Sequence, residues 1–226
     1  MNINYLTGSK LFSNISEALK VSQKTDSTVN DLEKYKKEVS ADEIKYWNNN
    51  DKDRANNCSR WDLDKIPLKF FVSKNVNNER FLPEFINAVK SCFQPWSRAS
   101  YGLIRFEETL NINNTDIIIA WSDNVVFGRD FEVGQNNLKV INNKIEKAEI
   151  TIIVYPIIDR LANSASRIER VRRTTLHEIG HALGLNHSNS SKDIMFHRGI
   201  NNKNLSSNDI RRLNELYNSK DPGILI

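Results

Sequence analysis

Residues 177–187 read HEIGHALGLNH and contain three of the four histidines in the 226-residue chain. Residues four apart on an α-helix lie on the same face, so His177 and His181 can bind one metal ion together. Glu178 lies about 100° round the helix from His177, which places its carboxylate beside such an ion and not among its ligands. This spacing predicts a metal-binding helix with an acidic side chain available for proton transfer.

A glycine after this helix decides where the third histidine goes. Gly184 stands where a helix ends with a positive φ, which only glycine adopts without strain. The turn would bring His187 back as a third ligand. Three nitrogen ligands leave one position of a tetrahedral zinc ion open, which is typical of catalytic sites, whereas closed structural sites favour cysteine ligands. The pattern therefore indicates a catalytic metal centre in preference to a chance match or a structural zinc.

The residues around this motif predict the helix that carries it. Ser166 and Glu169 form a capping box, which should start the helix. Core-facing residues then recur at spacings of three and four, at Ile168, Val171, Thr175, Leu176, Ile179, Ala182 and Leu183.

Other elements follow from the same kind of pattern. Strands are expected at residues 67–72, 102–107, 116–121 and 149–155. Helices are expected from Pro83 to about Trp96, with Pro95 kinking or ending the first, and from Ser206 or Ser207 to the region of Tyr217. Cys92 lies at helical spacing with apolar residues and is expected in the core. Residues 122–147 are polar and Asn-rich, and mostly a loop with one short strand is expected there.

Composition narrows the classes of function. Hydrophobic residues make up 39% of the chain and charged residues 27%, and no apolar run reaches the roughly 20 residues of a membrane span. The net charge is +4, but lysine and arginine are mixed with acidic residues, so nucleic-acid binding is not expected. No secretory signal is recognisable, which leaves a cytoplasmic location and export by another route both open. We expect a monomer.

The composition changes near residue 60. Residues 1–60 are polar with few aliphatics, and two short helices are plausible there, one along Leu11–Leu19 and one after a capping box at Ser40 and Glu43. This N-terminal extension could be a pro-region, a docking arm or a partly disordered segment. Residues 61–226 are expected to form the compact domain.

The motif resembles that of a known family. HEIGHALGLNHS, residues 177–188, resembles the extended zinc motif of metzincins, especially of the matrixin branch, in which serine follows the third histidine. Asp193-Ile194-Met195 resembles the Met-turn, whose methionine packs under the zinc ligands. LSSNDIRRLNELY, residues 205–217, is similar to the C-terminal helix of matrixins. Weaker similarity to their second and third strands lies at residues 99–106 and 116–121.

The resemblance covers about residues 61–218 and implies a metzincin α+β fold. That fold is a twisted, mostly parallel sheet with one antiparallel edge strand, packed on two long helices, plus a C-terminal helix. The edge strand would fall within residues 129–141, and a substrate peptide would lie along it as an added strand.

The resemblance also implies a zinc-dependent endopeptidase acting on proteins or peptides. His177, His181 and His187 would hold one catalytic zinc ion, and Glu178 would be the general base. Two alternatives stay open: a processing protease of narrow specificity, and an inactive metal-binding or scaffold homologue.

Three departures from the matrixin pattern leave further questions open. Matrixins usually have proline two residues after the Met-turn methionine, and this chain has His197 there. His197 could imitate a zinc-contacting tyrosine of other metzincins, or it could be an exposed turn histidine. The three further histidines of a second, structural zinc site are missing, while calcium binding by the Asn/Asp loops stays open. Cys58 stands near the place of the zinc-blocking pro-region cysteine, but the flanking NNCSRW differs from Pro-Arg-Cys-Gly, so a cysteine switch and an incidental surface thiol are both open.

Overall fold

The computed structural model describes residues 59–74, 78–122, 133–154, 159, 162–196 and 202–218. Cys58, His197 and the two helices expected in residues 1–60 lie outside these ranges. Among the described residues, no helix has the length and apolar character needed to cross a membrane.

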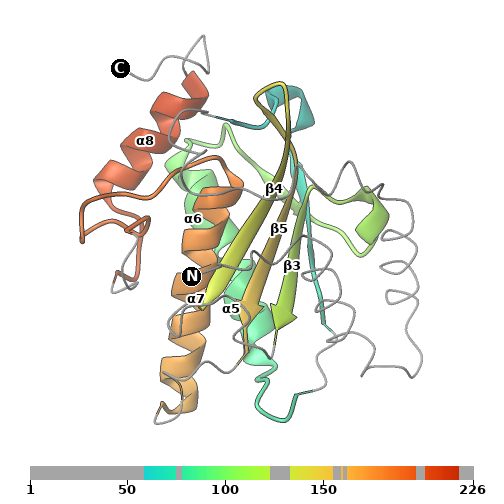
Figure 1. Cartoon of the computed structure of the whole chain (residues 1–226), viewed down its shortest axis with the longest axis vertical. Helices are drawn as coiled ribbons and strands as arrows, with labels where there is room; N and C mark the ends of the chain where they lie inside the picture. The colour runs from blue at the N-terminus through green and yellow to red at the C-terminus, as the bar shows by residue number, and fades with distance from the viewer. Residues whose placement is uncertain are drawn as a thin grey trace, which may run out of the picture.

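A five-stranded sheet forms the centre of the fold, in the order β2-β1-β3-β5-β4 (Figure 1). The strands are β1 (Leu68–Val72), β2 (Phe106–Glu108), β3 (Ile117–Ser122), β4 (Gly134–Ile141) and β5 (Lys144–Ile153). The β4 strand runs antiparallel to β5 at one edge, and the other pairs are parallel. The mostly parallel sheet with one antiparallel edge strand is therefore confirmed, and β4 lies within the range expected for that strand.

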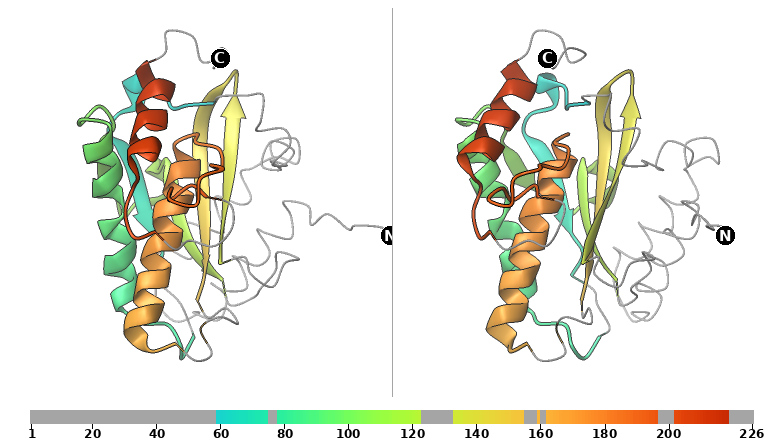
Figure 2. Two further views of the ribbon diagram at one scale, coloured as in Figure 1. Left: turned by 90° about the vertical axis from the view of Figure 1, so that its left-hand side faces the viewer. Right: turned by 60° about the vertical axis from the view of Figure 1, so that its left-hand side comes forward.

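Helices cover one face of this sheet (Figure 2). They are α5 (Glu84–Ser91), α6 (Phe93–Ala99) and α7 (Ser164–Ala182), while α8 (Ser207–Asn218) packs beside α6. Two short 3-10 helices, η2 (Leu63–Lys65) and η3 (Ile112–Asn114), complete the described elements. Alternate aliphatic residues of β3 and β5 point into one core with α5 and α7: Ile117, Ile119, Ala148, Ile150 and Ile152. Cys92 is buried in this core, as expected.

The region expected to be mostly loop, residues 122–147, contains most of a hairpin instead. The β4 strand is eight residues long, and β5 begins at Lys144, five residues before the strand start expected at Glu149. Asn142 and Asn143 join the strands with positive φ angles of 51° and 60°, the conformation of a tight hairpin turn. The polarity of this segment suggested a loop, whereas the Asn142-Asn143 pair was the local signal for a hairpin turn.

Three smaller expectations were wrong. The strand expected at residues 102–107 is only Phe106–Glu108, because Tyr101 and Gly102 form a turn with positive φ. The break in the first long helix falls at Cys92, and Pro95 lies in the first turn of α6, where a missing N–H costs no helical hydrogen bond. The cap of α7 is Asn163, whose side chain accepts a hydrogen bond from the Ser166 N–H at 2.9 Å, and not the Ser166–Glu169 capping box.

Candidate metal centre

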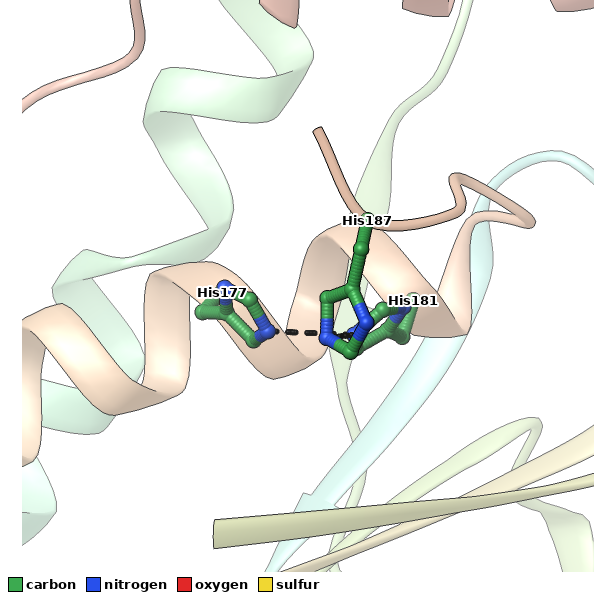
Figure 3. A group of neighbouring side chains, drawn as sticks. All are labelled: His177, His181 and His187. Carbon is green, nitrogen blue, oxygen red and sulfur yellow. Dashed lines mark hydrogen bonds between the residues drawn. The ribbon is translucent and has the colours of Figure 1, made fainter. Parts of the chain in front are cut away.

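The three histidines of the motif come together at the C-terminal end of α7. Figure 3 shows His177 and His181 on the helix and His187 reaching back toward them from the segment that follows. His177 and His181 are buried, with exposed fractions of 6% and 5%, whereas His187 is exposed. Gly184 has a φ of 95°, so the predicted turn after the helix is confirmed.

Hydrogen bonds to carbonyl groups determine which ring nitrogens face the centre. The Nδ1 atom of His177 lies 2.7 Å from the Ile194 carbonyl oxygen, and the Nδ1 atom of His181 lies 2.8 Å from the Leu185 carbonyl oxygen. A carbonyl only accepts hydrogen bonds, so each Nδ1 must carry the hydrogen. The Nε2 atoms of the neutral rings therefore present lone pairs to the centre.

These lone pairs lie unusually close together. The Nε2 atom of His181 is 3.0 Å from that of His177 and 3.1 Å from that of His187 (dashed lines in Figure 3). Two lone pairs at this distance repel each other unless a proton or a metal cation lies between them. A tetrahedral zinc ion with bonds of about 2.0–2.1 Å would separate its nitrogen ligands by roughly 3.3 Å. The donor atoms and their spacing therefore fit a zinc ion.

Glu178 belongs to α7, and its side chain lies against the edge strand β4. Its side chain is 6% exposed, and its backbone carbonyl accepts a hydrogen bond from Asn136 Nδ2 at 2.8 Å. A β-carbon built on Gly134 would lie 2.9 Å from Glu178 Oε1 and 2.6 Å from Thr174 Cγ2. Only glycine fits there, so Gly134 allows β4 to approach the carboxylate. The sequence analysis did not assign this role to Gly134; its only signal was a glycine in a polar stretch.

Met195 packs directly against α7. It is fully buried, and a β-carbon built on Gly180 would collide with its sulfur atom. Gly180 lies between His177 and His181 in the sequence, and Ile194, just before Met195, supplies the carbonyl that holds His177. The Met-turn expected from the sequence is therefore in contact with the part of α7 that carries His177 and His181.

Two buried aspartates hold this turn: Asp193, which belongs to the Met-turn motif itself, and Asp209, for which no such role was expected. Asp209 of α8 accepts hydrogen bonds from the backbone N–H groups of Ile194 at 2.8 Å and Met195 at 3.3 Å. Asp193 accepts hydrogen bonds from the Ser188, Ser206 and Asn208 side chains. Burial acts to raise the pKa of Asp193, but these hydrogen bonds and the charge of Arg212 outweigh it and hold that pKa below its usual value. The acidic and hydroxyl residues at the start of α8 were the sequence signal that could have indicated these contacts.

A model of the matrixin family matches residues 60–218 of the chain. That range contains the three histidines, Glu178 and Met195. The chain belongs to the matrixin family. The members of this family are zinc metallopeptidases.

Individual relatives match this matrixin over shorter stretches. A protein of Spodoptera frugiperda ascovirus 1a, provisionally assigned as a matrix metalloproteinase, is 48% identical over 54 residues, which are 21% of this chain. The macrophage metalloelastase of Oryctolagus cuniculus is 50% identical over 46 residues, which are 19% of this chain. These stretches span only 14% and 10% of the two relatives. The crystal structure of an archaemetzincin from Methanopyrus kandleri aligns with a TM-score of 0.47 and 14% identity, over 68% of this chain and 97% of that one.

Proposed function

We propose that this matrixin is a zinc-dependent endopeptidase, with His177, His181 and His187 as the zinc ligands and Glu178 as the general base. The observation that carries the proposal is the convergence of three Nε2 atoms, those of His177, His181 and His187. The His177 and His181 Nε2 atoms lie 3.0 Å apart while both Nδ1 hydrogens are used elsewhere, and a bound metal cation would remove the repulsion between their lone pairs.

Glu178 supplies the proton transfer in this proposal. Zinc, when bound, polarises the scissile carbonyl and makes a water molecule more acidic. The Glu178 carboxylate accepts the proton of that water and passes it to the leaving amine. Glu178 is buried where α7 faces β4, so its carboxylate is shielded from bulk solvent. Asn136 Nδ2 donates a hydrogen bond to its backbone carbonyl, which holds the residue in place.

The substrate would lie along β4. This strand pairs with β5 on one side, and no other described strand pairs with its outer edge. An extended peptide can add to such an edge through backbone hydrogen bonds, and this brings it past Glu178, next to Gly134.

The test is hydrolysis of a randomised peptide library by the zinc-loaded full chain, analysed by mass spectrometry. We expect one zinc ion per chain, cleavage of internal peptide bonds, and loss of cleavage on chelation that returns with zinc. Cleavage of only a few sequences would favour a processing protease of narrow specificity. A zinc-loaded chain that cleaves nothing, also after limited proteolysis of residues 1–58, would contradict the proposal and favour an inactive homologue.

A further inference from the structure

The third histidine is carried by a segment whose carbonyl groups are held by distant side chains. We call residues 182–187 the exit segment, because they lead out of α7 to His187. Trp61 Nε1 donates a hydrogen bond to the Ala182 carbonyl at 2.7 Å, and the Tyr217 hydroxyl donates one to the Leu183 carbonyl at 3.0 Å. Both donor side chains are buried, so these contacts anchor the start of the exit segment to both ends of the described domain.

Arg212 of α8 holds the other end of the exit segment. Its Nη2 atom donates a hydrogen bond to the Asn186 carbonyl at 2.9 Å and lies 3.4 Å from the His187 carbonyl oxygen. His187 is the exposed member of the histidine group and is not part of α7. Its position therefore depends on how its own backbone is held.

Besides these hydrogen bonds, Arg212 has one further interaction in the part of the chain that the structure describes: its positive charge helps to lower the pKa of Asp193. The Nη1 atom of Arg212 is buried without a hydrogen-bond partner within the described residues. A buried, unpaired N–H group is unfavourable for folding. The adjacent residue, Arg211, is different, because it is exposed and bonds only within α8, to Glu215 and Asn208. The hydrogen bonds that Arg212 makes are those to the exit segment.

We propose that Arg212 is a positioning residue for the third metal ligand: it fixes the Asn186 and His187 carbonyl groups and so keeps the His187 imidazole directed at the centre. This inference rests on the proposed zinc site. Removal of Arg212 would leave the two ligands on α7 in place while His187 samples other orientations. Groups that hold metal ligands from outside the coordination sphere typically contribute about 10–100-fold to metal affinity.

The charge of Arg212 predicts the opposite result. A cation near the site disfavours binding of a second cation, so loss of the charge alone should tighten zinc binding. Arg212→Lys keeps the charge but replaces the planar guanidinium with a single ammonium group. Positioning therefore predicts weaker binding in Arg212→Met and an intermediate loss in Arg212→Lys.

The experiment measures zinc affinity of the full chain by chelator competition, for the parent, Arg212→Met, Arg212→Lys and the matched control Arg211→Met. We expect a 10–100-fold loss for Arg212→Met, a smaller loss for Arg212→Lys and no change for Arg211→Met. The same substitutions are then made in a His187→Ala background. There Arg212→Met should cause no further loss, whereas a general structural role would weaken binding in both backgrounds. Unchanged or tighter binding in Arg212→Met, or an equal loss in the two backgrounds, would overturn the inference.

A second measurement does not depend on zinc. In the metal-free protein, backbone ¹⁵N relaxation should show greater motion of Asn186 and His187 in Arg212→Met than in the parent or Arg211→Met. If the parent binds no zinc, the proposed function fails, and the relaxation data still decide whether Arg212 orders the exit segment. Unchanged relaxation in a folded Arg212→Met protein would count against the inference.

Discussion

The metal centre has two parts that are held in place by different means. His177 and His181 lie one helical turn apart on α7, so any stable helix would bring their side chains to one face. His187 lies on the exit segment, where side chains from residue 61 and from α8 hold the backbone. The difference shows that a short motif is enough to place two of the proposed ligands, whereas the position of the third depends on side chains far away in the sequence.

The largest effect is expected at Glu178, in the helical part. Glu178→Gln keeps the size of the side chain but removes the base, so turnover should fall by about 10²–10⁴-fold. Zinc content should stay close to that of the parent, because this residue is proposed not to bind the metal. Peptide hydrolysis and metal analysis on the same samples test this. Near-parental turnover would show that the proposed mechanism is wrong.

Substitution of the two glycines of the motif tests the helical part and the exit segment separately. Gly180 lies in α7, and Gly184 lies in the exit segment. Gly184→Ala places a side chain at a φ of 95°, where it also collides with the Ser59 carbonyl, and should cost roughly 3 kcal/mol or more of the free energy of unfolding. Gly180→Ala improves helix propensity by about 1 kcal/mol, which offsets part of the roughly 1–3 kcal/mol cost of pressing on the Met195 sulfur and the buried Trp96 ring. We therefore expect it to have a much smaller net effect. Urea unfolding of the metal-free variants gives both values, and equal losses would contradict the comparison.

A third substitution compares the side of α8 that contacts the Met-turn with the exposed side of the same helix. In the parent, Asp209 Oδ2 accepts hydrogen bonds from the Ile194 and Ser206 N–H groups, and Oδ1 accepts one from the Met195 N–H group. Asp209→Asn replaces one of these oxygens with an NH₂ group, which then faces a backbone N–H donor. The buried mismatch should lower the free energy of unfolding by about 2 kcal/mol. Glu215→Gln, on the exposed side of the same helix, is the control and should cost less than about 1 kcal/mol. Thermal and urea unfolding would show whether the two variants differ.

The smallest effect is expected for Met195→Leu. Met195→Leu keeps a buried apolar side chain of similar volume, so it should cost less than about 1.5 kcal/mol, and zinc affinity should hardly change. Met195→Ala, which leaves a cavity against Gly180, should cost about 2–5 kcal/mol. A large loss of zinc affinity in Met195→Leu, measured by chelator competition, would indicate that the sulfur atom has a role beyond packing.

Much of the fold could be predicted from periodicity and from the family resemblance, and the misses have physical causes. The β1 and β3 strands and the start of α8 fall within a residue of expectation, because apolar runs and a serine cap are local signals. The resemblance placed the edge strand β4 correctly, but polarity alone predicted mostly a loop there, because polar residues such as Asn136 and Asn137 are buried by tertiary packing. The capping box before α7 was misplaced, since Asn163, three residues earlier, also has a capping side chain.

From the sequence alone, the candidate residues of the metal centre and the helix that carries two of them could be predicted. Their spacing of four and the following glycine are local facts of chain geometry. Tertiary packing set which ring nitrogens of His177 and His181 face the centre, because the Ile194 and Leu185 carbonyls set the tautomers of these two rings. It also decided that Gly134 meets Glu178 and that Arg212 meets the exit segment. Such contacts join residues far apart in the chain, and no local pattern encodes them.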